Sequence, residues 1–310
     1  MTITSAHELP QPSSSPAFSD AVTYAFGDAE ADVFAVARVG LSSGPEGEPQ
    51  GSGLAIVFAG REPVSVRAAG GLPVTSASFD AVAAAGVSTT TAVPLEQWAL
   101  SVENEDGTVA LALTFTAVSA PGEVEAGSAV AKTGGMQGYE QLCRVSGTAR
   151  VRGGTRTIDC LGQRGHSWGA PDWDRLVLAR TVSAWAGEDL GVALTTVRPA
   201  KAKSHADEAV QASVFAREPD AEGLAAAIEP DDARLSTTYD AEGRQRRAGL
   251  EIYETEEGYP HRGAGEVLCG TSLDLGRLRL DCSFFRWRLD GREGVGRYDI
   301  LRRSEDGSAA

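Results

Sequence analysis

The sequence has no long apolar run. No stretch approaches the roughly 20 apolar residues that a helix needs to cross a bilayer, so we expect no membrane insertion. The first residues, MTITSAHELPQPSSSP, lack the basic segment followed by an apolar one that marks a secretory signal. These two absences predict a cytoplasmic protein.

Metal-ligating residues are also scarce. The chain has 4 cysteines and 4 histidines, without a C-x-x-C pair or a tight ligand spacing, which argues against a metal site. We therefore predict no cofactor and no metal. Cys269 and Cys282 flank a turn at Leu275-Gly276 at equal distance, so they either face each other across a hairpin or remain reduced apolar side chains.

Basic residues are outnumbered. The 28 Lys and Arg against 43 Asp and Glu give a net charge of −15. Such a surface repels nucleic acid and anionic membranes, so neither is an expected partner. The sequence leaves the oligomeric state open.

What the chain does have is glycine, 36 residues of it, between short alternating segments. The clearest hairpin joins Arg150–Arg152 to Thr155–Ile158 through Gly153-Gly154. Only Ser78–Ala85 and Ala221–Ile228 are typical of short helices, the second ending before Pro230. Further strands are expected at Val33–Val39, Gly53–Phe58, Val109–Thr116, Leu176–Trp185, Gly191–Val197, Ala248–Tyr253, Leu278–Arg288 and Gly294–Leu301. This pattern favours an all-β fold of antiparallel sheets with few short helices.

A weak internal repeat points to two copies of one β-unit. Asp32–Val39 aligns with Asp174–Thr181 without gaps, and Gly53–Ile56 aligns with Gly191–Leu194. Each half then ends with an aromatic strand and an Asp-Gly turn. We predict a disordered arm over 1–18, a first β-barrel over 19–134, a second over 135–303 and a disordered tail over 304–310.

The stretch GHSWG, at 165–169, matches the G-x-S-x-G nucleophile elbow of α/β-hydrolases. The elbow requires a helix directly after the serine, whereas the residues after Ser167 indicate a turn and then a strand. A serine hydrolase that uses Ser167 is therefore the weaker hypothesis.

Other residues of this stretch carry more chemistry. His166 can exchange a proton near neutral pH, Trp168 and Trp173 can line a cavity, and Asp172 can orient the imidazole. Purely structural roles for these residues are equally consistent with the pattern. Upstream, Glu140 lies on an apolar-flanked strand beside Tyr139, facing either inward as an acid of raised pKa or outward to solvent.

The remaining aromatic residues lie mostly in expected strands. Trp98 and Trp185 are expected in the core, with Trp185 also a candidate for a pocket wall. Trp287 and Tyr298 are candidates to enter the second barrel and contact a ligand, although Tyr298 is equally consistent with an exposed position.

Four motifs occur in the order of a known group: GYEQ at 138–141, VSGT at 145–148, GQRGHSWG at 162–169 and DW at 172–173. The chain resembles the AttH-like and carotenoid 1,2-hydratase-like superfamily. The resemblance implies two tandem lipocalin-like (calycin) β-barrels packed together and a hydrophobic cavity, with His166 and Trp168 as pocket residues. Related members protonate an alkene or guide a pericyclic step without a cofactor. This chain has Gly165 where the group's motif has Asp. If that Asp is the group's proton donor, this protein must use Glu140, Asp172 or another acid, or it is not a catalyst of that kind.

These observations lead to one principal hypothesis. The protein would be a cofactor-free enzyme that hydrates, isomerises or cyclises a terpenoid- or polyketide-like molecule in a barrel cavity. His166, Glu140 and Asp172 are the catalytic candidates. Trp168, Trp173, Tyr139, Trp185, Trp287 and Tyr298 are the substrate-binding candidates. A non-catalytic carrier of an apolar ligand is the alternative.

Overall fold

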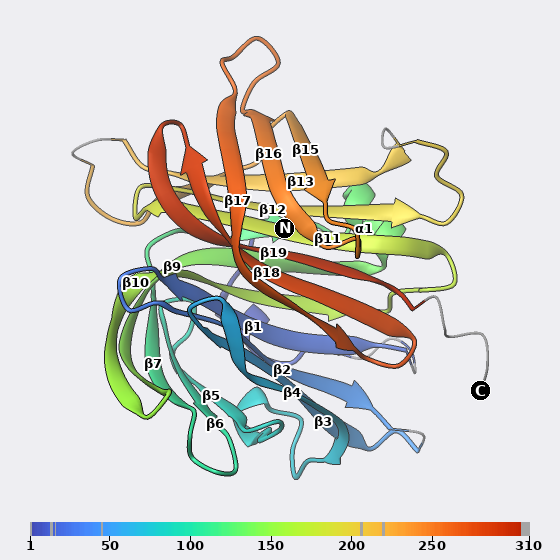
Figure 1. The fold of residues 1–310 in the computed structure, drawn as a ribbon. Coiled ribbons are helices and arrows are strands. Elements are labelled where there is room, and N and C mark those ends of the chain that lie inside the picture. The colour runs from blue at the N-terminus through green and yellow to red at the C-terminus, as the bar shows by residue number, and fades with distance from the viewer. Residues whose placement is uncertain are drawn as a thin grey trace.

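Two curled antiparallel sheets make up the molecule, one stacked on the other in the computed structural model (Figure 1). The structure describes residues 2–12, 15, 17–44, 46–204, 207–218 and 221–304. The expected tail falls outside this range except for Ser304. Within the described residues, no helix is long and apolar enough to cross a membrane.

The first sheet has ten strands, in the order β4-β3-β2-β1-β10-β9-β7-β6-β5, with β8 paired to β9. Their bounds are β1 Ser19–Asp28, β2 Val33–Ser43, β3 Pro49–Ala59, β4 Glu62–Pro73, β5 Val87–Val93, β6 Gln97–Glu103, β7 Ala110–Ala117, β8 Gly122–Val124, β9 Met136–Val151 and β10 Gly154–Gly169. Nearly every residue between Met136 and Gly169 thus belongs to one long hairpin of this sheet.

The second sheet has nine strands, in the order β14-β13-β12-β11-β19-β18-β17-β16-β15. Their bounds are β11 Leu176–Gly187, β12 Leu190–Pro199, β13 Ala209–Ala216, β14 Ala226–Ile228, β15 Asp232–Tyr239, β16 Gln245–Tyr253, β17 His261–Asp274, β18 Leu278–Leu289 and β19 Arg292–Arg303. The described helices are short: η1 Ser5–Glu8, η2 Phe79–Ala81 and α1 Ala129–Gly134.

The strand orders of the two sheets confirm a twofold β-unit but change its register. They coincide when β1 to β4 match β11 to β14, and when β5, β6, β7, β9 and β10 match β15 to β19. The sequence repeat instead matched β2 with β11, one strand out of step. The hairpin of β9 and β10 closes the first sheet, so the chain passes to the second sheet after Gly169 rather than near residue 135.

The predicted strands are confirmed, and one predicted helix is wrong. All the expected strands are present, and the β9–β10 turn uses Arg152 and Gly153, both with positive φ, as a two-residue hairpin requires. The expected helix over Ala221–Ile228 is wrong. Its last residues form β14, which pairs with β13, because sheet hydrogen bonds outweigh the helix propensity of a short alanine-rich segment.

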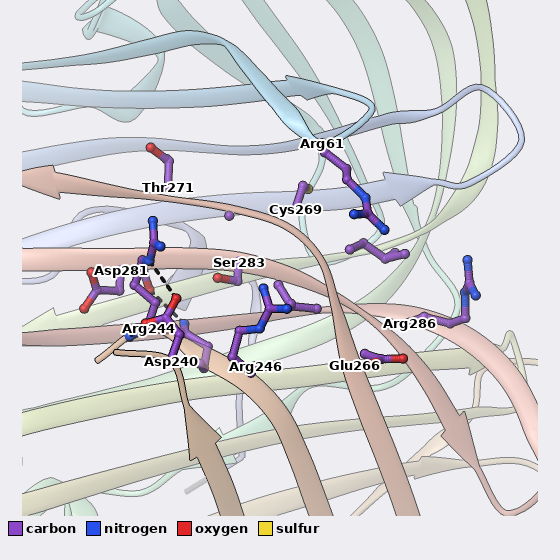
Figure 2. Close-up of a pocket in the computed structure, with 14 residues that line it drawn as sticks. Arg61, Asp240, Arg244, Arg246, Glu266, Cys269, Thr271, Asp281, Ser283 and Arg286 are labelled. Atoms are coloured by element: carbon purple, nitrogen blue, oxygen red, sulfur yellow. Dashed lines mark hydrogen bonds and ion pairs between the residues drawn. The ribbon is translucent and has the colours of Figure 1, made fainter. Parts of the chain in front are cut away.

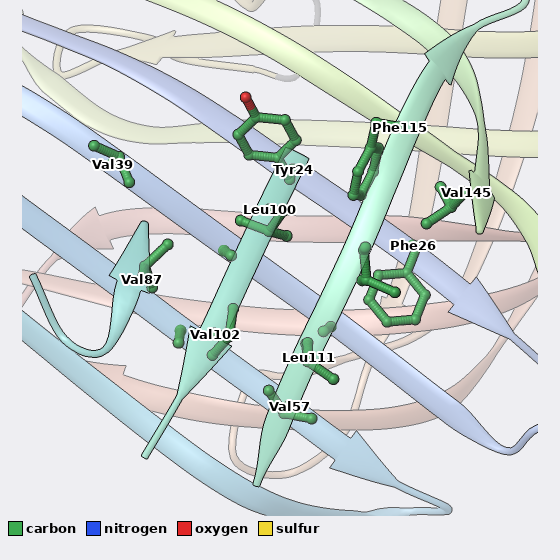
Figure 3. Close-up of a cluster of buried hydrophobic side chains, with 14 of the residues drawn as sticks. Tyr24, Phe26, Val39, Val57, Val87, Leu100, Val102, Leu111, Phe115 and Val145 are labelled. Carbon is green, nitrogen blue, oxygen red and sulfur yellow. The ribbon is translucent and has the colours of Figure 1, made fainter. Parts of the chain in front are cut away.

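Three apolar clusters hold the sheets. The first sheet encloses one around Tyr24, Phe26 and Phe115 (Figure 3). The second encloses another that includes Trp287. A third lies between the sheets, where the ring of Phe284 is 5.6 Å from that of Phe34 across the interface. Apolar side chains therefore pack inside both barrels and in part of the space between the sheets.

Candidate functional site

A cavity of about 730 Å³ lies between the two sheets. Strands β1 to β4, β9 and β10 contribute one wall, and β11, β12, β18 and β19 contribute the other, together with α1. Its lining is mostly apolar, as in sites that bind apolar small molecules. The hypothesis from the sequence placed the ligand inside a barrel, whereas this cavity lies outside the apolar clusters that the two barrels enclose.

Four residues form a row across the wall of the first sheet. Glu140 on β9 pairs with Gly165 on β10, Gly165 pairs with Thr23 on β1, and Thr23 pairs with Arg38 on β2. Residues paired across strands project from the same face of a sheet. Glu140, Thr23 and Arg38 all line the cavity. At the usual strand spacing, about 14 Å separates the Cα atoms at the two ends of the row.

Glu140 is the acid at one end of this row. Burial raises its pKa above the usual range for a glutamate, opposed by a hydrogen bond from Gln163 and by the charges of Arg297 and Arg164. Part of the side chain is accessible, and because Glu140 lines the cavity, that surface faces the cavity. Glu140 therefore points away from the interior of its own barrel and into the cavity between the sheets.

A relay of amide and indole groups fixes this carboxyl. Trp185 Nε1 donates to Gln163 Oε1 at 3.1 Å, so the amide nitrogen of Gln163 must point the other way. That nitrogen donates to Glu140 Oε2 at 2.7 Å. The predicted pocket residue Trp185 therefore lies in the core between the sheets and contacts the acid through Gln163.

Gly165 provides the space that Glu140 occupies. A Cβ atom at this position would lie 2.2 Å from Glu140 Oε2 and 2.5 Å from Oε1. Any side chain here would collide with the carboxyl. Glycine at position 165, where the group's motif has Asp, therefore makes room for the Glu140 carboxyl from the paired strand β9.

His166, Tyr139 and Trp168 belong to the other face of the same sheet. Neighbouring residues of a strand project to opposite sides, so His166 points away from Glu140 although it borders the cavity. Its Nε2 lies 2.6 Å from Asp20 Oδ1, and its Nδ1 lies 2.6 Å from the His7 carbonyl oxygen. Both ring nitrogens are occupied, so neither is free to exchange a proton with a molecule in the cavity.

The partner of this buried face is the N-terminal segment, expected to be disordered. Residues 5–8 form η1, and the Glu8 carboxylate enters the end of the first barrel. Glu8 Oε2 accepts from Arg164 at 2.7 Å and from Trp98 Nε1 at 3.1 Å, while Oε1 accepts from the Tyr139 hydroxyl at 2.8 Å. No pattern in this Ser- and Pro-rich segment marks Glu8 as a buried ion.

The other predicted site residues lie apart from one another. Trp173 lines the cavity and is half-buried. Asp172 is exposed, and its carboxylate accepts from the Asp174 backbone in a turn. Trp287 and Tyr298 are buried inside the second barrel, where the Tyr298 hydroxyl lies 2.7 Å from Thr237 Oγ1. Of the expected site, Glu140 and Trp173 line the cavity, and Tyr139 and His166 border it from the other face of the first sheet.

The serine hydrolase hypothesis lacks a suitable arrangement. Ser167 is inside β10, paired to β1 and β9 on both sides, and β11 rather than a helix follows it. No group of three or more His, Cys, Asp or Glu residues within the described ranges could hold a metal ion. His205 lies outside those ranges. The four cysteines are free, and Cys269 pairs across the hairpin with Phe284 rather than with Cys282.

A second cavity, of about 380 Å³, lies beside β16, β17 and β18. Arginines and carboxylates line much of it (Figure 2), and Arg244 is held by Asp240 at 3.0 Å. Glu140 is not among its lining residues. We therefore take the larger, apolar cavity as the candidate site.

This fold and cavity define a protein of two tandem lipocalin-like barrels with an apolar cavity between their sheets. The chain belongs to the family described as Domain of unknown function (DUF7064), whose model matches residues 4–303. No curated protein has significant sequence similarity to it.

Solved structures with the same fold confirm the expected architecture. An AttH candidate from Nitrosomonas europaea superposes with a TM-score of 0.63 at 11% identity, covering 94% of this chain and 93% of that one. Kievitone hydratase from Nectria haematococca gives 0.60 at 10% identity, covering 99% and 94%. CghA with Sch210972 gives 0.57 at 12% identity, covering 93% and 89%. At these identities the likeness to the AttH-like group concerns the fold.

Proposed function

We propose that the protein is a cofactor-independent enzyme that protonates a carbon–carbon double bond of a hydrophobic small molecule in the cavity between its sheets. The observation that carries this proposal is a carboxyl group of raised pKa facing an apolar cavity. Such a carboxyl holds its proton closer to neutral pH, which suits a general acid. One of the structural neighbours is a hydratase by name, and hydration of an alkene begins with this step.

Glu140 is the proton donor in this proposal. Its Oε2 accepts from Gln163, which leaves Oε1 to carry the proton. Transfer of that proton forms a C–H bond from the π electrons and leaves a carbocation beside a carboxylate. The indole of Trp173 can stabilise the cation through its π face. In hydration, water adds to the carbocation and returns a proton to the Glu140 carboxylate. In isomerisation, a neighbouring carbon loses a different proton to the same carboxylate. In cyclisation, attack by a second double bond forms a ring and a new carbocation, which then loses a proton to that carboxylate.

Deuterium from the solvent tests the proposal. The protein in D2O is incubated with prenylated phenols and polyenes, and the products are analysed by mass spectrometry. We expect at least one compound to gain deuterium on carbon, and Glu140→Gln to abolish the label. Recovery of every compound unlabelled would instead support a carrier, and equal labelling by the variant would exclude Glu140 as the acid.

The pH dependence of the labelling rate should identify the acid. Only the protonated carboxyl donates, so the rate should fall as pH rises through the raised pKa of Glu140. Gln163 hydrogen-bonds the carboxylate and lowers this pKa, so Gln163→Leu should move the fall to higher pH. Gln97→Leu, on β6, serves as the matched control. A fall at the same pH in wild type and Gln163→Leu would argue against the assignment.

A further inference from the structure

The far end of the row holds a cation, Arg38, that has no counter-ion among the described residues. The Arg38 guanidinium extends over Gly40, where a Cβ atom would lie 3.2 Å from its Nη1. Its hydrogen bond to Ser19 Oγ is long, at 3.5 Å. A guanidinium has five N–H donors. In the part of the chain that the structure describes, no carboxylate forms an ion pair with Arg38.

The charged residues described near Arg38 do not form an ion pair with it. Arg297, the second arginine of the cavity, is held by Asp299, whose Oδ2 accepts from Nε at 2.6 Å. Asp20 is engaged by His166 and by the Gln11 backbone. Burial lowers the pKa of Arg38, and the charge of Arg297 lowers it further while Asp20 opposes both. Arg38 is thus a partly desolvated charge whose main neighbour has the same sign.

A desolvated cation is unfavourable unless an anion or several acceptors compensate it. Planar guanidinium groups are well suited to pairs of oxygen atoms on an oxyanion. We infer that the ligand of this cavity is an apolar molecule with one oxyanion group, such as a carboxylate, enolate or phenolate, and that Arg38 binds this group. This inference rests on the proposed function only in assigning the ligand to the Glu140 cavity.

The row also sets the position of the reactive atom. Arg38 and Glu140 are separated in the row by Thr23 and Gly165. The Glu140 carboxyl lies over Gly165, so the small side chain of Thr23 stands between the two charged groups. With the oxyanion at Arg38, the atom next to Glu140 lies several bonds away from the acidic group. The substrate is therefore a long molecule that reacts in its apolar part, remote from its charge.

Two fluorescent probes that differ by one anionic group test the inference. 1-Anilinonaphthalene-8-sulfonate carries a sulfonate, and N-phenyl-1-naphthylamine is the same skeleton without it. We expect wild type to bind the sulfonate about 10- to 100-fold more tightly, the range for a charge-assisted hydrogen bond. Arg38→Met should remove this preference and leave the neutral probe within about twofold, while Arg38→Lys should keep part of it.

Arg61→Met is the matched control, because Arg61 is an exposed arginine of the smaller cavity. Thermal unfolding of each variant checks that the fold survives. Equal affinities for the two probes in wild type, no binding of either probe, or a preference that persists in Arg38→Met would each overturn the inference. Neither probe reacts, so the result of the binding experiment does not depend on turnover. If wild type prefers the sulfonate probe but no compound gains deuterium, the proposed enzymatic function is wrong while the Arg38 anion site stands.

Discussion

Replacing Glu8 by glutamine should lower the free energy of unfolding by about 3–5 kcal/mol, the range for breaking a buried ion pair from one side. The Arg164 guanidinium would then remain buried without its counter-ion, stacked 4.8 Å from the ring centre of Trp98. Urea unfolding followed by tryptophan fluorescence measures the loss.

Two further variants make this test specific. Glu30→Gln removes an exposed carboxylate and should unfold like wild type. Glu8→Gln combined with Arg164→Met removes both charges and should recover part of the loss. If Glu8→Gln stays within about 1 kcal/mol of wild type, the N-terminal segment does not anchor the barrel.

Gly165→Ala should reduce turnover by about 100- to 10,000-fold, as Glu140→Gln should, because that is the usual contribution of a general acid. The new methyl group would lie 2.2 Å from Glu140 Oε2, so the carboxyl would have to leave its position. We expect a stability loss of about 1–3 kcal/mol, typical of overpacking. The deuterium-labelling rate and the urea midpoint separate these two effects.

The same hairpin offers the control. Gly154→Ala adds a methyl group whose nearest neighbour, the Val151 carbonyl oxygen, is 3.9 Å away, so it should change neither quantity. Combining Glu140→Gly with Gly165→Asp moves the acid to the opposite strand, where the group's Asp stands, and should restore part of the rate. Full activity in Gly165→Ala would contradict the assigned role of Glu140.

The fold class could be predicted from local patterns because antiparallel strands with short turns leave strong signals in sequence. The β9–β10 hairpin is an example, with its turn shifted by a single residue. The repeat was detectable, but its register was not. Ungapped matches such as Asp32–Val39 with Asp174–Thr181 reflect alternation common to any strand, whereas the order of strands depends on pairing across the sheet.

The candidate site was predictable only in part, because a motif does not say which face of a strand is buried against what. Glu140 pairs across the hairpin with Gly165, the residue next to His166, yet Glu140 and His166 project to different sides of the sheet. Both faces are covered, one by the second sheet and the other by the N-terminal segment, so alternation could not separate them. Arg38 was missed because an arginine in a strand usually indicates a solvated face.

The docking of Glu8 has a consequence for how the chain folds. Its partners Tyr139 and Arg164 are 131 and 156 residues away in sequence. The segment that carries Glu8 is synthesised before β10, so its carboxylate has no partner until β10 has left the ribosome. Such distant contacts form late and slow folding. We expect the first barrel to close around its strands before this segment locks it, and a protease to cut the N-terminal segment most readily during that interval.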